Sequence, residues 1–260
     1  MPSKFISFHS MVIGTGKSSL IVQAGRELSK RNYRVLLVDG YMYEIGALRH
    51  KIRDIIGVLP KETAGKNLYD LIEDYETIST HYINPAFPAT FGTVNKLNIP
   101  STNDHGGRLM PEVKDRVLSI PNMPGLDFLP GNNGDVLEIK KPIDFERIFE
   151  KWDGRGFFHY IKQEFTSQYD FVLCDTHTGY ETLAGVICGH MADQVIAVSV
   201  DEPENAADNQ SYQADVRLTQ RMHSAGERPA EVIPINSQDI DNLLRVIMGP
   251  TDQDPVAIQQ

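Results

Sequence analysis

The chain has 260 residues, of which 41% are hydrophobic, 23% charged and 8% aromatic, and its formal net charge is −10. This length accommodates one large α/β domain, and the acidic balance argues against a protein that coats nucleic acid over its whole surface. No apolar run approaches the ~20 residues that span a bilayer, and no secretory leader is visible, so we expect a cytoplasmic protein. Cys174 and Cys188 lack a metal-binding spacing and are expected to be free thiols in a reducing compartment.

The first elements along the chain have the pattern of a β-α-β unit. Residues 4–8 (KFISF) form an apolar run typical of a buried strand, and residues 17–30 carry apolar side chains at helical spacing. Residues 33–40 (YRVLLVDG) form a second apolar strand that ends at Asp39. Strand, glycine loop, helix and strand in this order predict a right-handed crossover and a parallel sheet.

The middle of the chain has a different composition. Residues 76–135 are rich in Pro, Asn, Gly and Thr, and only residues 125–131 (GLDFLPG) have the pattern of a strand. Irregular stretches of this length are uncommon in a compact domain unless they are functional. We therefore expect an irregular insertion at about 76–135 within a single domain that spans residues 1–260.

The second half of the chain returns to alternating strands and helices. Helices are expected at residues 157–165 and 214–225, and strands at residues 169–179, 192–200 and 230–236. Apolar strands that alternate with helices are buried on both faces of a sheet. The sequence thus predicts an α/β fold, a doubly wound and mostly parallel sheet flanked by helices.

The segment between the first strand and the first helix reads FHSMVIGTGKSS. Its end has the order of a phosphate-binding loop, in which glycines let the backbone approach phosphates, Lys17 reaches the β and γ phosphates and the Ser18 hydroxyl ligates Mg²⁺. The common GxxxxGK[ST] pattern is incomplete because Met11 takes the place of its first glycine. The five residues GTGKS can occur by chance in an unrelated turn. Their position directly after an expected strand and before an expected helix favours a phosphate-binding loop. The expected nucleotide-binding residues are Gly14, Thr15, Gly16, Lys17, Ser18 and Ser19.

Two carboxylates follow buried strands. Asp39 ends the strand after the loop's helix, and Asp175 ends the strand at residues 169–179. Parallel strands bring their carboxyl ends to one edge of a sheet, where Asp175 would support the metal and Asp39 would orient water. An aspartate after a strand can also simply cap a turn.

With these residues, the sequence resembles the ParA/MinD family of deviant Walker ATPases, a P-loop class whose loop reads KGGxGK[ST]. The segments RVLLVDG, YDFVLCDTHTG, ADQVIAVSVDEP and VIPIN match the family's later strands and switch segments, and the likeness covers about residues 4–59 and 126–237. The resemblance implies ATP hydrolysis with Mg²⁺, with Asp175 just beyond the direct metal ligands. It also implies that Asn236 contacts adenine.

Two departures from the family pattern concern catalysis. The signature lysine, which crosses a sandwich dimer to the partner's phosphates, is replaced by Val12, and the second aspartate of switch I is replaced by Tyr41. Hydrolysis is therefore expected to be slow without a partner protein. As the substitute cation we favour Lys151, then Arg155; alternatively, Lys151 is a surface residue of an amphipathic helix. A missing loop lysine with an external candidate also resembles the carboxysome-positioning McdA subgroup.

The resemblance further implies a homodimer on ATP binding, non-specific DNA binding and an adaptor protein that stimulates hydrolysis. Arg217 and Arg221 are four residues apart and are the expected DNA contacts, although Asp215 and Glu227 could pair with them instead. The C-terminal residues MGPTDQDPVAIQQ lack a basic amphipathic pattern, so we expect no membrane attachment. DNA binding would instead associate the protein with the nucleoid.

The sequence therefore predicts a ParA-type positioning ATPase that distributes a cargo such as carboxysomes. Two alternatives remain open: a nucleotide-binding scaffold that does not hydrolyse ATP, and an ATPase module of a bacterial defence or kinase-like system. His9, His177 and His190 form no recognisable triad with a serine. We expect local structural roles for them, and a γ-phosphate contact for His177 as the alternative.

Overall fold

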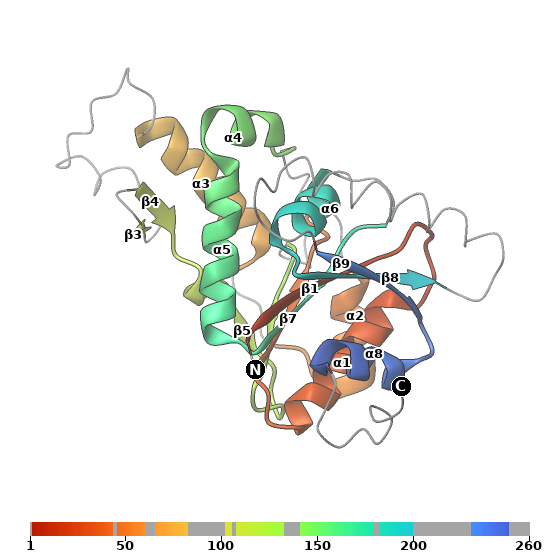
Figure 1. Ribbon diagram of the computed structural model, residues 1–260. Coiled ribbons are helices and arrows are strands. Elements are labelled where there is room, and N and C mark those ends of the chain that lie inside the picture. The colour runs from red at the N-terminus through yellow and green to blue at the C-terminus, as the bar shows by residue number, and fades with distance from the viewer. Residues whose placement is uncertain are drawn as a thin grey trace.

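The computed structural model describes residues 2–43, 46–60, 66–82, 102–105, 108–132, 141–178, 182–199 and 230–249. Its centre is a seven-stranded sheet with the order β5-β6-β2-β7-β1-β8-β9 (Figure 1). The strands are β1 (Lys4–His9), β2 (Val35–Asp39), β5 (Leu118–Ser119), β6 (Leu126–Leu129), β7 (Phe171–Asp175), β8 (Gln194–Ser199) and β9 (Glu231–Asn236). All neighbours are parallel except β5 and β6. The predicted doubly wound, mostly parallel sheet is confirmed.

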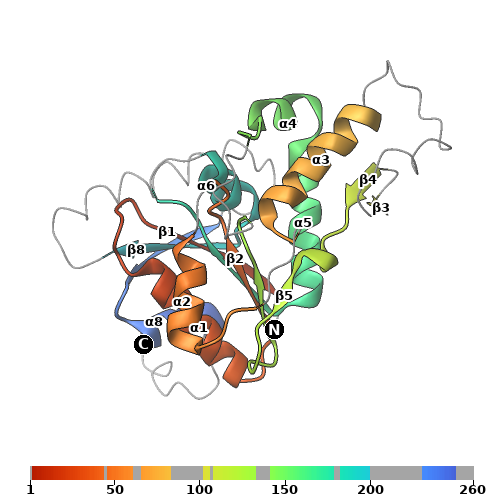
Figure 2. The same ribbon diagram turned by 180° about the vertical axis from the view of Figure 1, so that it is seen from behind.

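Helices cover both faces of this sheet (Figures 1 and 2). One face carries α1 (Lys17–Lys30), α2 (Ala47–Ile56) and α8 (Ile240–Met248), whose apolar residues share one core cluster with the strands. The other face carries α3 (Leu68–Tyr82), α4 (Phe145–Lys151), α5 (Gly154–Gln168) and α6 (Thr182–Val186), followed by the π-helix η3 (Ile187–Met191). In the described part of the chain, no helix has the length and apolar character needed to cross a membrane.

The strand sequences explain the close packing of the sheet between its two layers of helices. All five residues of β2 and all five of β7 are buried, as expected of central parallel strands covered on both faces. On α1, Leu20, Ile21 and Leu28 are at most 1% exposed. Each such side chain contributes about 1.5–3 kcal/mol on burial. The loops at the carboxyl edge of the sheet therefore stand on a firmly packed base.

Residues 76–135 contain more regular structure than their composition indicated. Helix α3 continues to Tyr82, and β3 (Thr102–His105) pairs with β4 (Arg108–Pro111) as an antiparallel hairpin. A 3-10 helix, η2 (Lys114–Arg116), precedes β5. The strand expected at residues 125–131 is confirmed as β6, which joins the main sheet beside β2. The helix expected at residues 214–225 lies outside the described residues.

Candidate functional site

The loop between β1 and α1 has the backbone of an anion-binding turn. Gly14 and Gly16 have φ angles of 87° and 81°, a left-handed conformation that glycine adopts without strain. Gly16 is also the residue that caps the N-terminus of α1. The first N–H groups of a helix have no partner within the helix, and its dipole favours negative charge there. The loop is therefore suited to phosphate.

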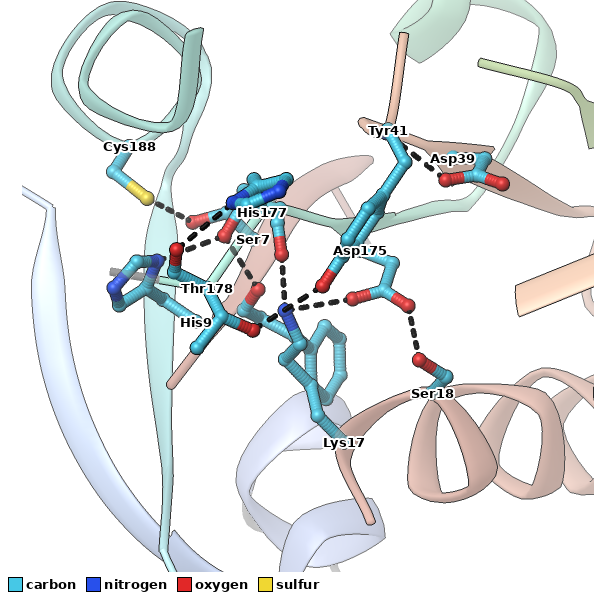
Figure 3. Close-up of polar contacts among 12 residues, drawn as sticks. Ser7, His9, Lys17, Ser18, Asp39, Tyr41, Asp175, His177, Thr178 and Cys188 are labelled. Carbon is cyan, nitrogen blue, oxygen red and sulfur yellow. Dashed lines mark hydrogen bonds and ion pairs between the residues drawn. The ribbon is translucent and has the colours of Figure 1, made fainter. Parts of the chain in front are cut away.

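Three side chains from α1 and β7 meet behind this loop (Figure 3). Lys17 Nζ lies 2.9 Å from Asp175 Oδ1, and Ser18 Oγ donates a 2.5 Å hydrogen bond to Asp175 Oδ2. Lys17 also donates to the main-chain oxygen of Thr176. Lys17 is 4% exposed and Asp175 is 0% exposed, so the ion pair is shielded from water. The arrangement holds an ammonium group and a hydroxyl group at the start of α1.

The burial of these groups shapes their charges. Burial is the largest single influence on Lys17 and disfavours its charged form, but Asp175 and Tyr41 together outweigh burial and raise the lysine's pKa. His9 lies beside them at the end of β1. Burial, together with the charges of Lys17 and His177, lowers the pKa of His9 to about 3. Lys17 is therefore cationic and His9 neutral at neutral pH.

His9 holds Thr176 in position. The Thr176 hydroxyl donates a 2.8 Å hydrogen bond to the main-chain oxygen of Phe8, so its oxygen is the acceptor for His9 Nδ1 at 3.0 Å. The neutral His9 is thus assigned the Nδ1–H tautomer by its hydrogen-bond partner. Because the main-chain oxygen of Thr176 accepts from Lys17, His9 supports the lysine through one intermediate residue.

Tyr41 connects the segment after β2 with the segment after β7 (Figure 3). Its hydroxyl lies 3.2 Å from Thr178 Oγ1, and its ring lies 4.7 Å from the ring of His177. Lys17 Nζ lies 5.5 Å from the centre of the Tyr41 ring. Tyr41, which takes the place of the second aspartate of switch I, therefore contacts Thr178 and His177 after β7 and lies near Lys17 of α1.

Asp39 has a different environment from Asp175, although the two residues lie directly opposite each other on β2 and β7. Asp39 is buried, and its Oδ1 accepts a 3.0 Å hydrogen bond from the Tyr41 N–H. Its carboxylate also packs so closely against Gly46 that a Cβ on Gly46 would overlap it. In this conformation the Asp39 carboxylate packs against Gly46, the residue that precedes α2.

A cavity of about 510 Å³ opens over the loop. This volume is within the range of about 300–1,000 Å³ common for small-molecule sites. The described residues that line it are Ser10, Val12, Ile13, Gly14, Thr15, Gly16, Lys17, Ser18, Ser19, Tyr41, Ala47, Lys51, His177 and Thr178. Val12 and Ile13 are exposed at its rim, at 38% and 87%. All six expected loop residues thus face one cavity, whereas Asp39 and Asn236 are not in its lining.

The oxygen donors of the site fit Mg²⁺. Within the described residues, no three His, Cys, Asp or Glu side chains cluster as a self-sufficient metal site. Mg²⁺ does not require one, because it is usually held by one or two protein oxygens, phosphate oxygens and water. The Ser18 hydroxyl and the Asp175 carboxylate, 2.5 Å apart, provide such oxygens beside the phosphate loop.

Comparisons with known proteins identify the fold. No protein-family model matches the sequence, and no curated protein does. Among solved structures, a plasmid partition protein from Borrelia burgdorferi is 14% identical over 95% of this chain and 99% of its own, with a TM-score of 0.54. The chain has a ParA/MinD-like fold.

Two further structures share the ParA/MinD-like fold at low identity. MinD from Pyrococcus horikoshii, a septum site-determining protein solved with Mg-ADP, is 16% identical over 92% of this chain and 77% of its own, with a TM-score of 0.50. The ATP complex of a Cyanothece McdA variant is 14% identical over 94% of this chain and 79% of its own, with a TM-score of 0.55. Identities this low describe the fold of this chain and not its activity.

Three other expected site residues, Lys151, Arg155 and Asn236, are not among the described residues that line the cavity. Lys151 is exposed at the C-terminal end of α4, and Arg155 is exposed in the first turn of α5. Asn236 ends β9, and its Oδ1 accepts a 2.9 Å hydrogen bond from the Gln238 N–H, which forms a local turn before α8. Arg217 and Arg221 lie outside the described residues.

Several residues at the site were not expected from the sequence. Thr176 contributes a main-chain oxygen, which no residue type reveals, and His9 acts through Thr176. Lys51 lines the cavity from α2, a helix that was not expected. Its apolar positions Leu48 and Ile52, four residues apart and buried, were the available signal.

Proposed function

We propose that this protein binds ATP at the phosphate loop and hydrolyses it with Mg²⁺. The proposal rests on the convergence of Lys17, Ser18 and Asp175 beside the N-terminus of α1. Asp175 lies 2.9 Å from the Lys17 ammonium group and 2.5 Å from the Ser18 hydroxyl. A phosphate loop after a strand and before a helix is the context in which these residue types bind nucleotides. The ParA/MinD-like fold supports the same function.

Each residue has a role that follows from its contacts. Lys17 would place its ammonium group on the β and γ phosphates, and the N–H groups from Gly14 to Ser19 would hold the phosphate oxygens. Ser18 would bind Mg²⁺, and Asp175 would orient the Ser18 hydroxyl and the water around the metal. When bound, Mg²⁺ neutralises charge that develops on the phosphates. Asn236 would contact the adenine ring.

Calorimetric titration with Mg-ATP tests the proposal. Wild-type protein is expected to bind, and Ser18→Ala is expected to bind Mg-ATP at least about tenfold more weakly because a metal ligand is lost. Lys17→Ala is expected to abolish binding. Because it also leaves the buried Asp175 without its cationic partner, Ser18→Ala is the cleaner variant. Absence of binding by folded wild-type protein would rule out the function.

A non-hydrolysing nucleotide-binding scaffold is the second candidate. One observation in its favour is that Asp39 packs against Gly46 and is not among the described residues that line the cavity. The other is that Tyr41 takes the place of the second aspartate of switch I. Steady-state phosphate release by wild type and Lys17→Ala separates the two candidates. Release by wild type that the variant loses supports the ATPase; nucleotide binding with no release supports the scaffold.

We further propose that the ATP state is a sandwich dimer that positions a cargo, such as carboxysomes, on non-specific DNA. This proposal is supported by the proteins that share the fold, which include a plasmid partition protein, a septum site-determining protein and McdA. Lys151 would reach the partner's phosphates, Arg217 and Arg221 would contact DNA, and an adaptor protein would stimulate hydrolysis. Salt-titrated DNA binding with and without ATP checks this assembly, and absence of binding at low salt with ATP would exclude the DNA step.

A further inference from the structure

The cavity over the phosphate loop has two cationic side chains from different elements. Lys17 comes from α1 and Lys51 from α2, and the described residues that line the cavity include no carboxylate. A nucleoside triphosphate keeps net negative charge after one Mg²⁺ binds. The charge of the lining therefore favours the bound anion from two directions.

Lys17 alone does not balance that anion. Its ammonium group already pairs with the buried Asp175 at 2.9 Å, so the pair adds little net charge to the site. Val12 at the rim of the cavity has no charge to add. A second cation is needed, and among the described lining residues Lys51 is the remaining lysine or arginine.

The position of Lys51 follows from the packing of α2. Helix α2 packs along α1, which begins at the loop, and Lys51 lies one turn after Ala47 on the face that lines the cavity. The side chain of Lys51 is 41% exposed, so its long apolar stem can change rotamer without opening the core.

The present contact of Lys51 is easily exchanged. Lys51 Nζ lies 3.8 Å from Asp54 Oδ2, and Arg53 Nε lies 3.9 Å from Asp54 Oδ1. All three side chains are at least 41% exposed, and ion pairs of this kind contribute little to stability. If Lys51 turns toward a phosphate, Asp54 keeps Arg53 as its partner.

We infer that Lys51 contacts the terminal phosphates of the nucleotide bound to its own chain and supplies the second positive charge of the site. The inference rests on the proposed ATP binding. It assigns to a residue of the same chain the charge that Val12 does not provide.

Titration calorimetry with Mg-ATP tests the inference on wild type, Lys51→Met and Lys30→Met. Lys30 is the matched control, because it is exposed, pairs with Glu27 three residues away at 2.7 Å and lies at the far end of α1. Lys51→Met is expected to weaken binding about tenfold, the size of one lost charged hydrogen bond, and Lys51→Arg to restore most of it. Lys30→Met is expected to bind like wild type.

The titrations are run at concentrations where light scattering finds monomers, so that only contacts within one chain are measured. Equal affinities for wild type and Lys51→Met would overturn the role of Lys51 and leave the proposed function standing. An equal loss in Lys30→Met would also overturn it, because a general charge effect would explain the result. A wild type that binds no nucleotide would overturn both proposals.

Discussion

Lys17 and Asp175 form an ion pair that water hardly reaches. Placing two charges in the interior is unfavourable, and good geometry with further hydrogen bonds is needed to offset it. Here Thr176 and Ser18 provide those hydrogen bonds. The ammonium group of Lys17 is therefore desolvated and held in its charged form before any ligand arrives. To contact a phosphate, the ammonium group would exchange part of these contacts, but it would not have to gain a proton.

His9 makes the stability of this arrangement depend on pH. Its pKa is about 3 in the folded protein, against 6.5 in the unfolded chain, mainly because burial disfavours its charged form. Between these values the unfolded chain binds one more proton, so stability falls as the pH falls below 6.5. We expect His9 to account for a loss of about 2 kcal/mol between pH 7 and pH 5.

Urea unfolding at pH 7 and pH 5, on wild type and His9→Asn, measures this contribution. The asparagine amide can replace the Nδ1–H donor to Thr176 but does not titrate. The other histidines are the same in both proteins, so their effects cancel. The wild type should lose about 2 kcal/mol more than the variant. Equal losses would show that His9 is not held neutral by burial.

At the scale of single residues, the sequence indicated which side chains lie together where a residue type and a spacing define a motif. Lys17, Ser18 and Asp175 were expected near one another, and the structure brings them together. Thr176 could not be recognised, because its main-chain oxygen accepts from Lys17 and any residue carries such an oxygen. Asp39 was expected to face the site, but nothing in its sequence context reveals the close packing against Gly46.

At the scale of elements, the junction of β2 and α2 decides how the cavity is formed. Gly46 precedes α2, and a side chain on it would overlap the buried Asp39 carboxylate. Gly46→Ala must therefore displace Asp39 or shift α2, and we expect a loss of about 1–3 kcal/mol, as in other overpacked sites. Because α2 carries Ala47 and Lys51 into the cavity lining, Mg-ATP binding should weaken as well.

Gly185→Ala is the matched control for this change. Gly185 lies in α6, and a Cβ built on it has no neighbour within 4 Å. Alanine in a helix at such a position is neutral or stabilises by up to about 1 kcal/mol. Chemical denaturation of both variants gives the comparison. If Gly46→Ala were as stable as Gly185→Ala, close packing at the start of α2 would not be a constraint.

The elements that could be predicted are those with strong local patterns. The strands β1, β2, β6, β7, β8 and β9 and the helices α1 and α5 lie where apolar runs or helical spacing indicated. Helices α2 and α8 were not expected, although each buries apolar residues at helical spacing, because their exposed faces are polar and their segments are short. Helix α3 ends at Tyr82, inside the Pro- and Asn-rich stretch of residues 76–135. The average composition of that stretch does not reveal that its first residues are helical.

At the scale of the whole molecule, the sheet order assembles the site from distant parts of the chain. β1 lies between β7 and β8, and this brings the loop after β1 beside Asp175, more than 150 residues later in the sequence. The parallel direction of the strands was predictable from their alternation with helices. Their order was not, because buried apolar strands carry no local information about which neighbour they pair with.

The same arrangement bears on dimerisation. The cavity opens at the carboxyl edge of the sheet, and Lys151 is exposed at the end of α4, outside its lining. If Lys151 contributes to ATP binding, it does so in a partner subunit. We expect wild type to form a dimer with ATP and Mg²⁺, and Lys151→Ala to dimerise about tenfold more weakly through the loss of one charged contact.

Light scattering after size exclusion, over a series of protein concentrations, measures this difference. Lys141→Ala is the control, since Lys141 is an exposed lysine ten residues earlier and carries the same charge. Its dimer should match that of the wild type.

A wild type that stays monomeric with ATP would exclude the sandwich dimer itself. A Lys151→Ala dimer of full strength would exclude only this lysine, and Arg155, exposed in the first turn of α5, would be the next cation to replace. Because Lys51 is proposed to act within one chain and Lys151 between chains, only the Lys51 substitution should weaken Mg-ATP binding at concentrations where the protein is monomeric.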